Sequence, residues 1–387
     1  MRNSHRYKVL FLSSWYPNRI DPLLGNFVQR HAEAVSEFAD VASLYVCSDQ
    51  NVTAKKFEIE IKKNGNIFSV NIYYKKIINK FPIISQLQKF FRNRKAHKIG
   101  FAEILKHFSN KPDIVHLNVA FPAGLFARWL KKKYRLPYII TEHSTLYHLS
   151  MTVKENYFTK KICGGADLIC PVSDDLKRVM EIKGFGKQFE VVPNVVNTDL
   201  FRLSENKNQK KKIIHISTLK EWQKNSSGML RVIKKLSETR SDFEFHIISD
   251  GDLSLATKIS KEYDLLNKTI FIYPTQTLEK VAEILRASDL FLLFSNFENL
   301  PCVIIEALAS GIPVVSTDVG GIPELINEKN GMLVKPNDEV ALFEKLNEML
   351  DKHNSFNKEE LRKFAVENFS YHAVGEKFSD IYSRILK

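Results

Sequence analysis

Two carboxylates, Glu298 and Glu306, lie in the stretch whose sequence pattern is the most informative about function. Glu298 falls in a polar loop after an apolar run, and Glu306 falls in the second turn of an expected helix, Pro301 to Ser310. Pro at the first helical position and Gly311 just past the last are typical helix boundaries. Because a second apolar run follows, the stretch predicts a strand, a loop, a helix and another strand.

This arrangement suits a phosphorylated ligand. Units of this kind bind ligands outside the carboxyl ends of their strands, and a helix N-terminus attracts anions. Since proline has no N–H, the backbone donors for a diphosphate would be those of Leu300, Cys302 and Val303. Glu306 would accept hydrogen bonds from a ribose, and Glu298 would reach a sugar beyond the diphosphate. The alternative is that both acids merely stabilise the helix dipole. The two acids, the short loop and the buried helix together favour a ligand site.

The same region resembles the signature of a known family. The likeness to the group 1 glycosyltransferases, retaining glycosyltransferase family 4, lies in the spacing from Glu298 to Glu306 and Ala307, in Gly311-Ile-Pro313-Val-Val, and in Gly320-Gly321-Ile-Pro323-Glu324. The resemblance implies an α/β protein of GT-B architecture, with two Rossmann-like doubly wound domains facing each other across a cleft that holds a nucleotide-sugar. In this segment the donor-binding candidates are Glu298, Asn299, Leu300, Cys302, Val303 and Glu306.

Length and alternating elements also indicate two domains, because 387 residues are too many for one typical core. Alternating strands and helices are typical of parallel α/β sheets. We expect strands at residues 8–13, 41–47, 113–117, 138–141, 166–171, 189–192, 212–217, 243–249, 269–272, 290–294 and 314–316. The lysine-rich stretch 197–212 is the best linker candidate, which predicts domains at 1–196 and 197–369. The resemblance implies that the last helix, within 370–387, packs back on the first domain.

Cations for the diphosphate are expected after the first strand of the second domain. The resemblance matches Lys224 to the lysine that clamps the diphosphate in the family, whereas Ser217 and Thr218 replace the usual Gly-Arg pair. Lys220 is then the substitute for the arginine. Cations placed there would stabilise the charge that develops on the leaving diphosphate. The alternative is a solvated basic loop. The resemblance also places Tyr273 near the base.

The motif Asp250-Gly251-Asp252 has two interpretations. Two carboxylates at this spacing can share a divalent cation with phosphates. The resemblance instead indicates the turn after the second strand of a nucleotide-binding domain, and the match around Glu298 favours the turn. We therefore expect no essential metal and no cofactor besides the nucleotide-sugar co-substrate.

The first domain is expected to bind the acceptor. Gly25 and Asn26 stand between the first strand and its helix, where glycine lets the backbone approach a ligand closely. The resemblance implies that this loop lies near the diphosphate, although a plain tight turn is equally consistent with the sequence. His143 matches the family histidine beside the transferred sugar, and Asn194 matches a structural turn at the hinge between the domains.

The resemblance implies a retaining hexosyl transfer in which the leaving diphosphate takes the acceptor proton. Glu298, His143 and Lys224 are the catalytic candidates, and the acceptor is expected to be a glycan or a lipid-linked intermediate of cell-surface polysaccharide or glycolipid synthesis. An epimerase or phosphorylase would need its catalytic groups placed otherwise. A catalytically silent nucleotide- or glycan-binding module is the other alternative, and only the replacement at Ser217-Thr218 favours it.

Composition and apolar runs indicate the cell compartment in which we expect the protein. No apolar stretch approaches the roughly 20 residues of a membrane span. The apolar run Val9 to Leu12 is too short for a signal peptide and predicts a strand. Four scattered cysteines, Cys47, Cys163, Cys170 and Cys302, favour reduced thiols in the cytoplasm.

The net charge of +13 is concentrated in part between Lys75 and Lys111, where ten Lys or Arg residues accompany one acid, Glu103. Apolar residues interleave with them, among them Phe81, Ile83, Ile84, Leu87, Phe90 and Phe91. The pattern predicts either a helix on the inner face of an anionic membrane or a core helix with a solvated basic face. The charge would also allow nucleic acid, but no recognition motif supports that partner, so we expect none.

Overall fold

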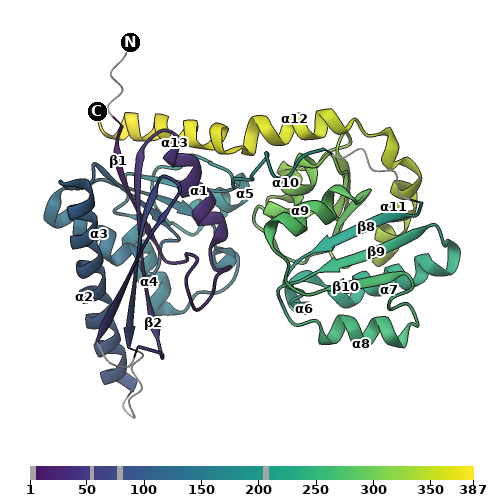
Figure 1. The fold of residues 1–387 in the computed structure, drawn as a ribbon, viewed down its shortest axis with the longest axis horizontal. Helices are drawn as coiled ribbons and strands as arrows, with labels where there is room; N and C mark the ends of the chain where they lie inside the picture. The colour runs from purple at the N-terminus through teal and green to yellow at the C-terminus, as the bar shows by residue number, and fades with distance from the viewer. Residues whose placement is uncertain (1–5, 53–55, 76–81, 204–208) are drawn as a thin grey trace. The chain divides into compact units, whose positions relative to one another are not determined.

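The computed structural model describes residues 6–52, 56–75, 82–203 and 209–387, and it divides the chain into two compact units (Figure 1). The first unit comprises Met1–Val195 and Tyr371–Lys387, and the second comprises Val196–Ser370. Residues 76–81 of the expected basic segment and 204–208 of the expected linker lie outside the described residues.

The first unit is built on a seven-stranded sheet in the order β3-β4-β2-β1-β5-β6-β7, parallel except for the edge strand β3. Helices and one short 3-10 helix, η1, connect the strands. The elements are β1 Lys8–Ser13, α1 Asn26–Ser36, β2 Asp40–Asp49, β3 Phe57–Asn64, β4 Ile67–Lys75, α2 Pro82–Phe108, β5 Ile114–Asn118, α3 Gly124–Tyr134, β6 Tyr138–Glu142, η1 Thr145–Tyr147, α4 Val153–Cys163, β7 Leu168–Pro171, α5 Asp174–Ile182 and α13 Tyr371–Ile385.

The second unit contains a six-stranded sheet, β10-β9-β8-β11-β12-β13, in which all neighbouring strands are parallel. Its elements are β8 Lys211–Ile216, α6 Glu221–Lys224, α7 Ser226–Thr239, β9 Phe243–Ile248, α8 Ser254–Glu262, β10 Ile270–Tyr273, α9 Leu278–Arg286, β11 Leu290–Leu293, α10 Cys302–Ala309, β12 Val314–Thr317, η2 Ile322–Glu324, β13 Gly331–Val334, α11 Glu339–Lys352, η3 His353–Ser355 and α12 Lys358–Phe369.

Some expected strands differ in the structure. Residues 189–192 are not a strand: Phe189 forms an isolated bridge to Ile169 in β7, and Pro193, which has no N–H to donate, follows. The sequence prediction missed β3, β4 and β13. It also began the strand at residue 212, within the expected linker, whereas β8 begins at Lys211.

Apolar strands form the centre of each unit. Val9 to Leu12 are fully buried in β1, and the residues of β11 are fully buried in the second sheet. This is the pattern of parallel strands that helices cover on both faces.

The last helix, α13, packs against α1 in the first unit. A Cβ at Gly375 would lie 2.3 Å from Ala34 O, so the small residue permits the close approach of the two helices. The hydroxyl of Tyr371 donates to Glu33 Oε2 (2.7 Å), and the Tyr382 hydroxyl lies 2.6 Å from His116 Nδ1 in β5. The helix is therefore part of the core of this unit.

In the second unit, α12 is tied to the first residues of the unit and to the end of α10. Arg362 Nη1 donates to Phe201 O (2.8 Å) and Ala309 O (2.9 Å), and its Nη2 donates to Thr198 O (2.9 Å). Helix α10 is buried almost throughout, which matches a sequence that is apolar except for Glu306. No helix within the described residues combines the length and apolar character needed to cross a membrane.

Candidate functional site

Most of the candidate residues follow the carboxyl ends of strands in the second unit. Lys220 and Lys224 come after β8, and Glu298 to Glu306 come after β11. In this sheet the direction in which successive strands are added reverses between β8 and β11. Open parallel sheets bind ligands at such a reversal. The candidates after β8 and β11 therefore lie at the position where this fold class holds its ligand.

Lys224 and Glu298 form a buried ion pair there. The Lys224 ammonium contacts Glu298 Oε1, and the two side chains are only 11% and 8% exposed. Ser295 Oγ donates to the same carboxylate oxygen (2.7 Å), and Thr317 Oγ1 donates to Ser295 O (2.6 Å), which fixes the loop to β12. Two residues that the sequence predicts separately are therefore in direct contact.

Helix α10 begins one residue later than expected. Pro301 was predicted at the first helical position, but it is the cap: its φ is −70° and its ψ is 117°, and the helix starts at Cys302. The proline ring fixes φ only, so the extended ψ lets the Pro301 carbonyl accept the Ile304 N–H (3.2 Å). Leu300, Cys302 and Val303 still surround the helix N-terminus, and Glu306 is buried in its second turn.

The backbone of the two glycines after β12, Gly320 and Gly321, packs against the loop that carries Glu298. Gly320 has φ +56°, and a Cβ there would lie 1.9 Å from Glu298 O. Gly321 N donates to Asn299 O (2.8 Å). The loop that carries Glu298 and Asn299 can therefore keep its path only if residue 320 has no side chain.

Ser217, which departs from the family pattern, braces the loop after β8. His215 Nδ1 donates to Leu292 O (2.9 Å), so its Nε2 accepts from Ser217 Oγ (2.7 Å). Ser217 Oγ in turn accepts the Leu219 N–H (3.1 Å). Lys220, which is exposed, and Lys224, which is buried, stand at the two ends of α6.

An exposed aromatic pair that the sequence analysis did not single out lies beside these residues. The rings of Trp222 and Phe297 are 55% and 41% exposed, and their centroids are 6.2 Å apart. Asn296 N donates to Gln223 O (2.7 Å) and Gln223 Nε2 donates to Phe297 O (3.3 Å), which ties the two loops together. Phe297 directly precedes Glu298 and Trp222 lies two positions from both Lys220 and Lys224, but only the order of the strands brings the rings together.

The motif Asp250-Gly251-Asp252 forms a turn. A Cβ at Gly251 would lie 1.8 Å from Thr218 O, and Asp252 Oδ1 accepts the Ser254 N–H (2.9 Å) at the start of α8. Tyr273, at the end of β10, stacks on His246 of β9, with ring centroids 5.9 Å apart. Across residues 6–52, 56–75, 82–203 and 209–387, no cluster of three or more His, Cys, Asp or Glu side chains is arranged to hold a metal ion.

The candidates of the first unit also gather in one place. Gly25 caps α1 in the left-handed conformation (φ +67°), and a Cβ there would lie 2.6 Å from the Trp15 carbonyl carbon. Asn26 begins the helix, and the next residue, Phe27, contacts the His143 ring at a centroid distance of 4.6 Å. His143 Nδ1 donates to Asn194 Oδ1 (3.1 Å).

His143 is neutral at ordinary pH, because burial, together with the nearby His31, holds its pKa well below the usual value. The residue before it, Glu142, holds the loop in place. The Glu142 carboxylate accepts N–H groups of Ala120 (3.0 Å), His143 (2.9 Å) and Ser144 (3.0 Å), and also the Tyr147 hydroxyl (2.8 Å). Burial nevertheless raises the pKa of Glu142. The sequence alone does not indicate this role, because the Ala120 N–H and the Tyr147 hydroxyl reach Glu142 only once the chain is folded.

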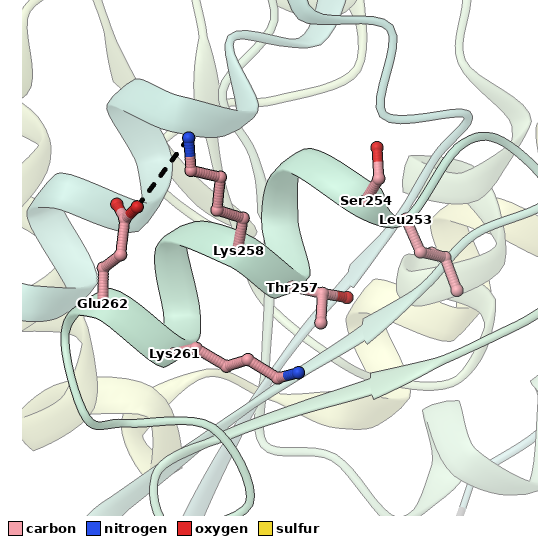
Figure 2. Close-up of a pocket in the computed structure, with 6 residues that line it drawn as sticks. All are labelled: Leu253, Ser254, Thr257, Lys258, Lys261 and Glu262. Atoms are coloured by element: carbon pink, nitrogen blue, oxygen red, sulfur yellow. Dashed lines mark ion pairs between the residues drawn. The ribbon is translucent and has the colours of Figure 1, made fainter.

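A separate depression of about 530 Å³ lies on α8 (Figure 2). Its lining is Leu253, Ser254, Thr257, Lys258, Lys261 and Glu262, which all belong to this helix or its cap. Lys258 Nζ and Glu262 Oε1 are 3.8 Å apart, an ordinary surface ion pair. None of the candidate residues lines this depression, so it adds nothing to the site.

Comparison with known proteins covers most of the chain. The family described as "Glycosyl transferases group 1" matches residues 197–368, and "Glycosyltransferase Family 4" matches residues 69–200. The uncharacterized glycosyltransferase MJ1178 of Methanocaldococcus jannaschii is 28% identical over 82% of this chain and 83% of its own length. TuaC of Bacillus subtilis, named as a teichuronic acid biosynthesis glycosyltransferase, is 23% identical over 87% of each chain.

A solved structure shares the fold. HepE from Anabaena, in complex with UDP and glucose, has a TM-score of 0.72 at 15% sequence identity and covers 98% of this chain and 100% of its own. The parallel sheets of the two units and this likeness define a protein of the GT-B class. With both family matches, the chain belongs to the group 1 glycosyltransferases.

Proposed function

We propose that the protein transfers a hexosyl group from a nucleotide-diphosphate-sugar to a glycan or a lipid-linked acceptor in the synthesis of a cell-surface polysaccharide or glycolipid. The transfer retains the anomeric configuration and needs no metal ion. The observation that carries the proposal is the buried Lys224–Glu298 pair beside the N-terminus of α10, at the strand reversal of the second sheet. The name of TuaC supports the polysaccharide setting, and the UDP complex of HepE makes UDP the first nucleotide to test.

The donor would bind through complementary charges. Its diphosphate would contact Lys224 and Lys220 and the backbone around Leu300, Cys302 and Val303, because a helix N-terminus and ammonium groups both favour anions. Glu306 would accept hydrogen bonds from the ribose hydroxyls. Without a donor, Lys224 neutralises Glu298. When the diphosphate attracts Lys224, the Glu298 carboxylate becomes available to the hydroxyls of the sugar, together with Asn299.

The reaction would need little acid–base chemistry from the protein. The bond between the anomeric carbon and the diphosphate oxygen breaks while the acceptor oxygen bonds to the same face of the sugar. The acceptor proton passes to the departing phosphate oxygen. Lys224 would stabilise the charge that develops on that oxygen more than it stabilises the ground state. Neutral His143, in the first unit, remains the candidate for hydrogen bonding to a sugar hydroxyl.

The aromatic pair beside the site suits a sugar. A hexose presents C–H groups on its ring faces, and these pack well on aromatic rings. Trp222 and Phe297 are half-exposed; Trp222 lies on α6 with Lys224, and Phe297 directly precedes Glu298. We therefore assign them to packing against the transferred sugar or the acceptor.

The experiment is an assay of the intact protein with UDP-, GDP- and ADP-sugars, free oligosaccharides and polyprenyl-diphosphate-linked sugars, in EDTA. Proton NMR of the product gives the anomeric configuration. We expect a product with the configuration of the donor, formed without added metal and lost in Glu298→Gln but not in the exposed control Glu328→Gln. An inverted product, or activity only with metal, would refute the proposed mechanism. Donor binding without transfer or hydrolysis would favour the silent binding module.

A further inference from the structure

The first turns of α2 expose large apolar side chains. Ile84, Leu87, Phe90 and Phe91 are 45%, 53%, 46% and 61% exposed. In an α-helix, residues three, four and seven positions apart share one side, so Ile84, Leu87 and Phe91 form a stripe, and Phe90, three positions after Leu87, lies at its edge. The opposite side of α2 is buried, with Ala96, Gly100 and Ile104 among its core residues. Exposed apolar stripes of this kind mark interaction surfaces.

Basic residues continue the outward side of the helix. Arg94, Lys95 and Lys98 lie one to two turns beyond the apolar stripe, on the same side by helical spacing. No acidic residue occurs from Ile84 to Ala102, where five Lys or Arg residues occur. The outward side of α2 therefore passes from apolar to basic along its length.

The start of α4 extends this surface. Lys154 Nζ donates to Gln86 Oε1 (3.2 Å), which places the beginnings of α4 and α2 next to each other. Val153 and Tyr157 of α4 are 88% and 56% exposed, and Lys160 and Lys161 follow within a turn. We call Ile84, Leu87, Phe90, Phe91, Arg94, Lys95, Lys98, Val153, Lys154 and Tyr157 the α2–α4 surface.

We infer that the α2–α4 surface binds the face of an anionic phospholipid bilayer. Half-exposed Phe, Leu and Ile side chains enter the boundary between head groups and acyl chains, and Lys and Arg pair with lipid phosphates. Charge decides between this occupant and a second copy of the chain. A symmetric dimer through this surface would bring two basic clusters together, and like charges across an interface are unfavourable. The inference does not depend on the proposed transferase activity, although it would bring such an enzyme to lipid-linked acceptors.

Flotation of the full-length protein with vesicles tests the inference, without any nucleotide-sugar. Vesicles of phosphatidylcholine are compared with vesicles that also contain phosphatidylglycerol. We expect about tenfold or stronger binding to the anionic vesicles, weakened by salt, because several basic residues contribute. The double variant Leu87→Gln/Phe91→Gln should lose most of the binding. The triple variant Arg94→Gln/Lys95→Gln/Lys98→Gln should lose the preference for anionic lipid.

The matched control is Ile182→Gln/Val340→Gln, which replaces two apolar residues, 80% and 62% exposed, outside the α2–α4 surface. It should bind vesicles like the original protein. Equal binding to neutral and anionic vesicles, or equal loss in the control, would overturn the inference. So would a dimer in light scattering that Leu87→Gln/Phe91→Gln converts to a monomer. Vesicle binding by a protein that transfers no sugar would leave this inference standing while the proposed function fails.

Discussion

The buried pair of Lys224 and Glu298 gives a prediction in which substitutions affect the melting temperature and the rate of transfer differently. Replacing Lys224 by Met keeps most of the side-chain length but leaves the Glu298 carboxylate buried with only the Ser295 hydroxyl among the contacts described above. Removing one partner of a buried pair costs about 3–5 kcal/mol. For a domain of this size each kcal/mol shifts the melting temperature by about 2–4 °C. We therefore expect Lys224→Met to lower the melting temperature of the second unit by about 6 °C or more.

The double variant Lys224→Met/Glu298→Gln removes both charges. Because no uncompensated carboxylate is left, it should recover most of the lost stability, and the difference from the sum of the single variants measures the coupling. Activity should not recover: without the cation, the rate of transfer should stay about 100-fold or more below the original. Calorimetric unfolding and the transfer assay check the two parts. A melting temperature unchanged in Lys224→Met, or singles that simply add, would refute the account of the pair.

Three further predictions concern the loops, the core and the aromatic pair. Gly320→Ala should lower the melting temperature strongly and abolish donor binding, because the new Cβ would lie 1.9 Å from Glu298 O. The control Gly65→Ala has the same φ of +56° but no atom within 4 Å, so it should lower the free energy of unfolding by only about 1 kcal/mol. Equal losses in thermal unfolding would contradict the contact. Burial lowers the pKa of His31, His97 and His215 from 6.5 to about 4, so their neutral forms stabilise the fold above pH 6.5 and this stabilisation is lost as the pH falls toward 4. At pH 5 each histidine should lower the free energy of unfolding by about 2 kcal/mol relative to pH 7, and in urea unfolding His97→Gln should reduce this loss. Equal stability at pH 7 and pH 5 would contradict the prediction. Trp222→Ala should raise KM for the sugar donor or acceptor with little effect on the melting temperature, because the ring is half-exposed. Kinetics equal to those of the original protein would show that Trp222 does not contact either substrate.

Much of the fold could be predicted because parallel strands are apolar over their whole length. The prediction of β1 at Lys8–Ser13 matches the structure, and β8 to β12 differ from their predicted bounds by one or two residues. The hairpin of β3 and β4 was missed although a signal was present. Gly65-Asn66 stands between two runs of alternating character, which is typical of a two-residue hairpin turn. The charged residues of β3 obscured it, because an edge strand exposes one side.

The sequence named the candidate site residues one by one, but it did not show which of them are in contact. Lys224 and Glu298 are 74 positions apart, and only the placement of β8 beside β11 brings them together. The same holds for Trp222 and Phe297. The interleaved apolar and basic residues of α2 are visible in the sequence, yet only burial shows that Phe91 faces outward while His97 faces the core. Sequence patterns indicate which residues could form a site, and the order of the strands determines which of them are in contact.

Calorimetric titration of the intact protein with UDP, GDP and ADP, in EDTA, tests the central claim most directly. The account predicts that one of these nucleotides binds and that Glu306→Ala, which removes the buried acid of α10, weakens it at least about tenfold, as expected for the loss of charged hydrogen bonds. The exposed control Glu328→Ala should bind like the original. Failure of the folded protein to bind any of the three nucleotides, or binding that Glu306→Ala leaves unchanged, would contradict the assignment of the donor site.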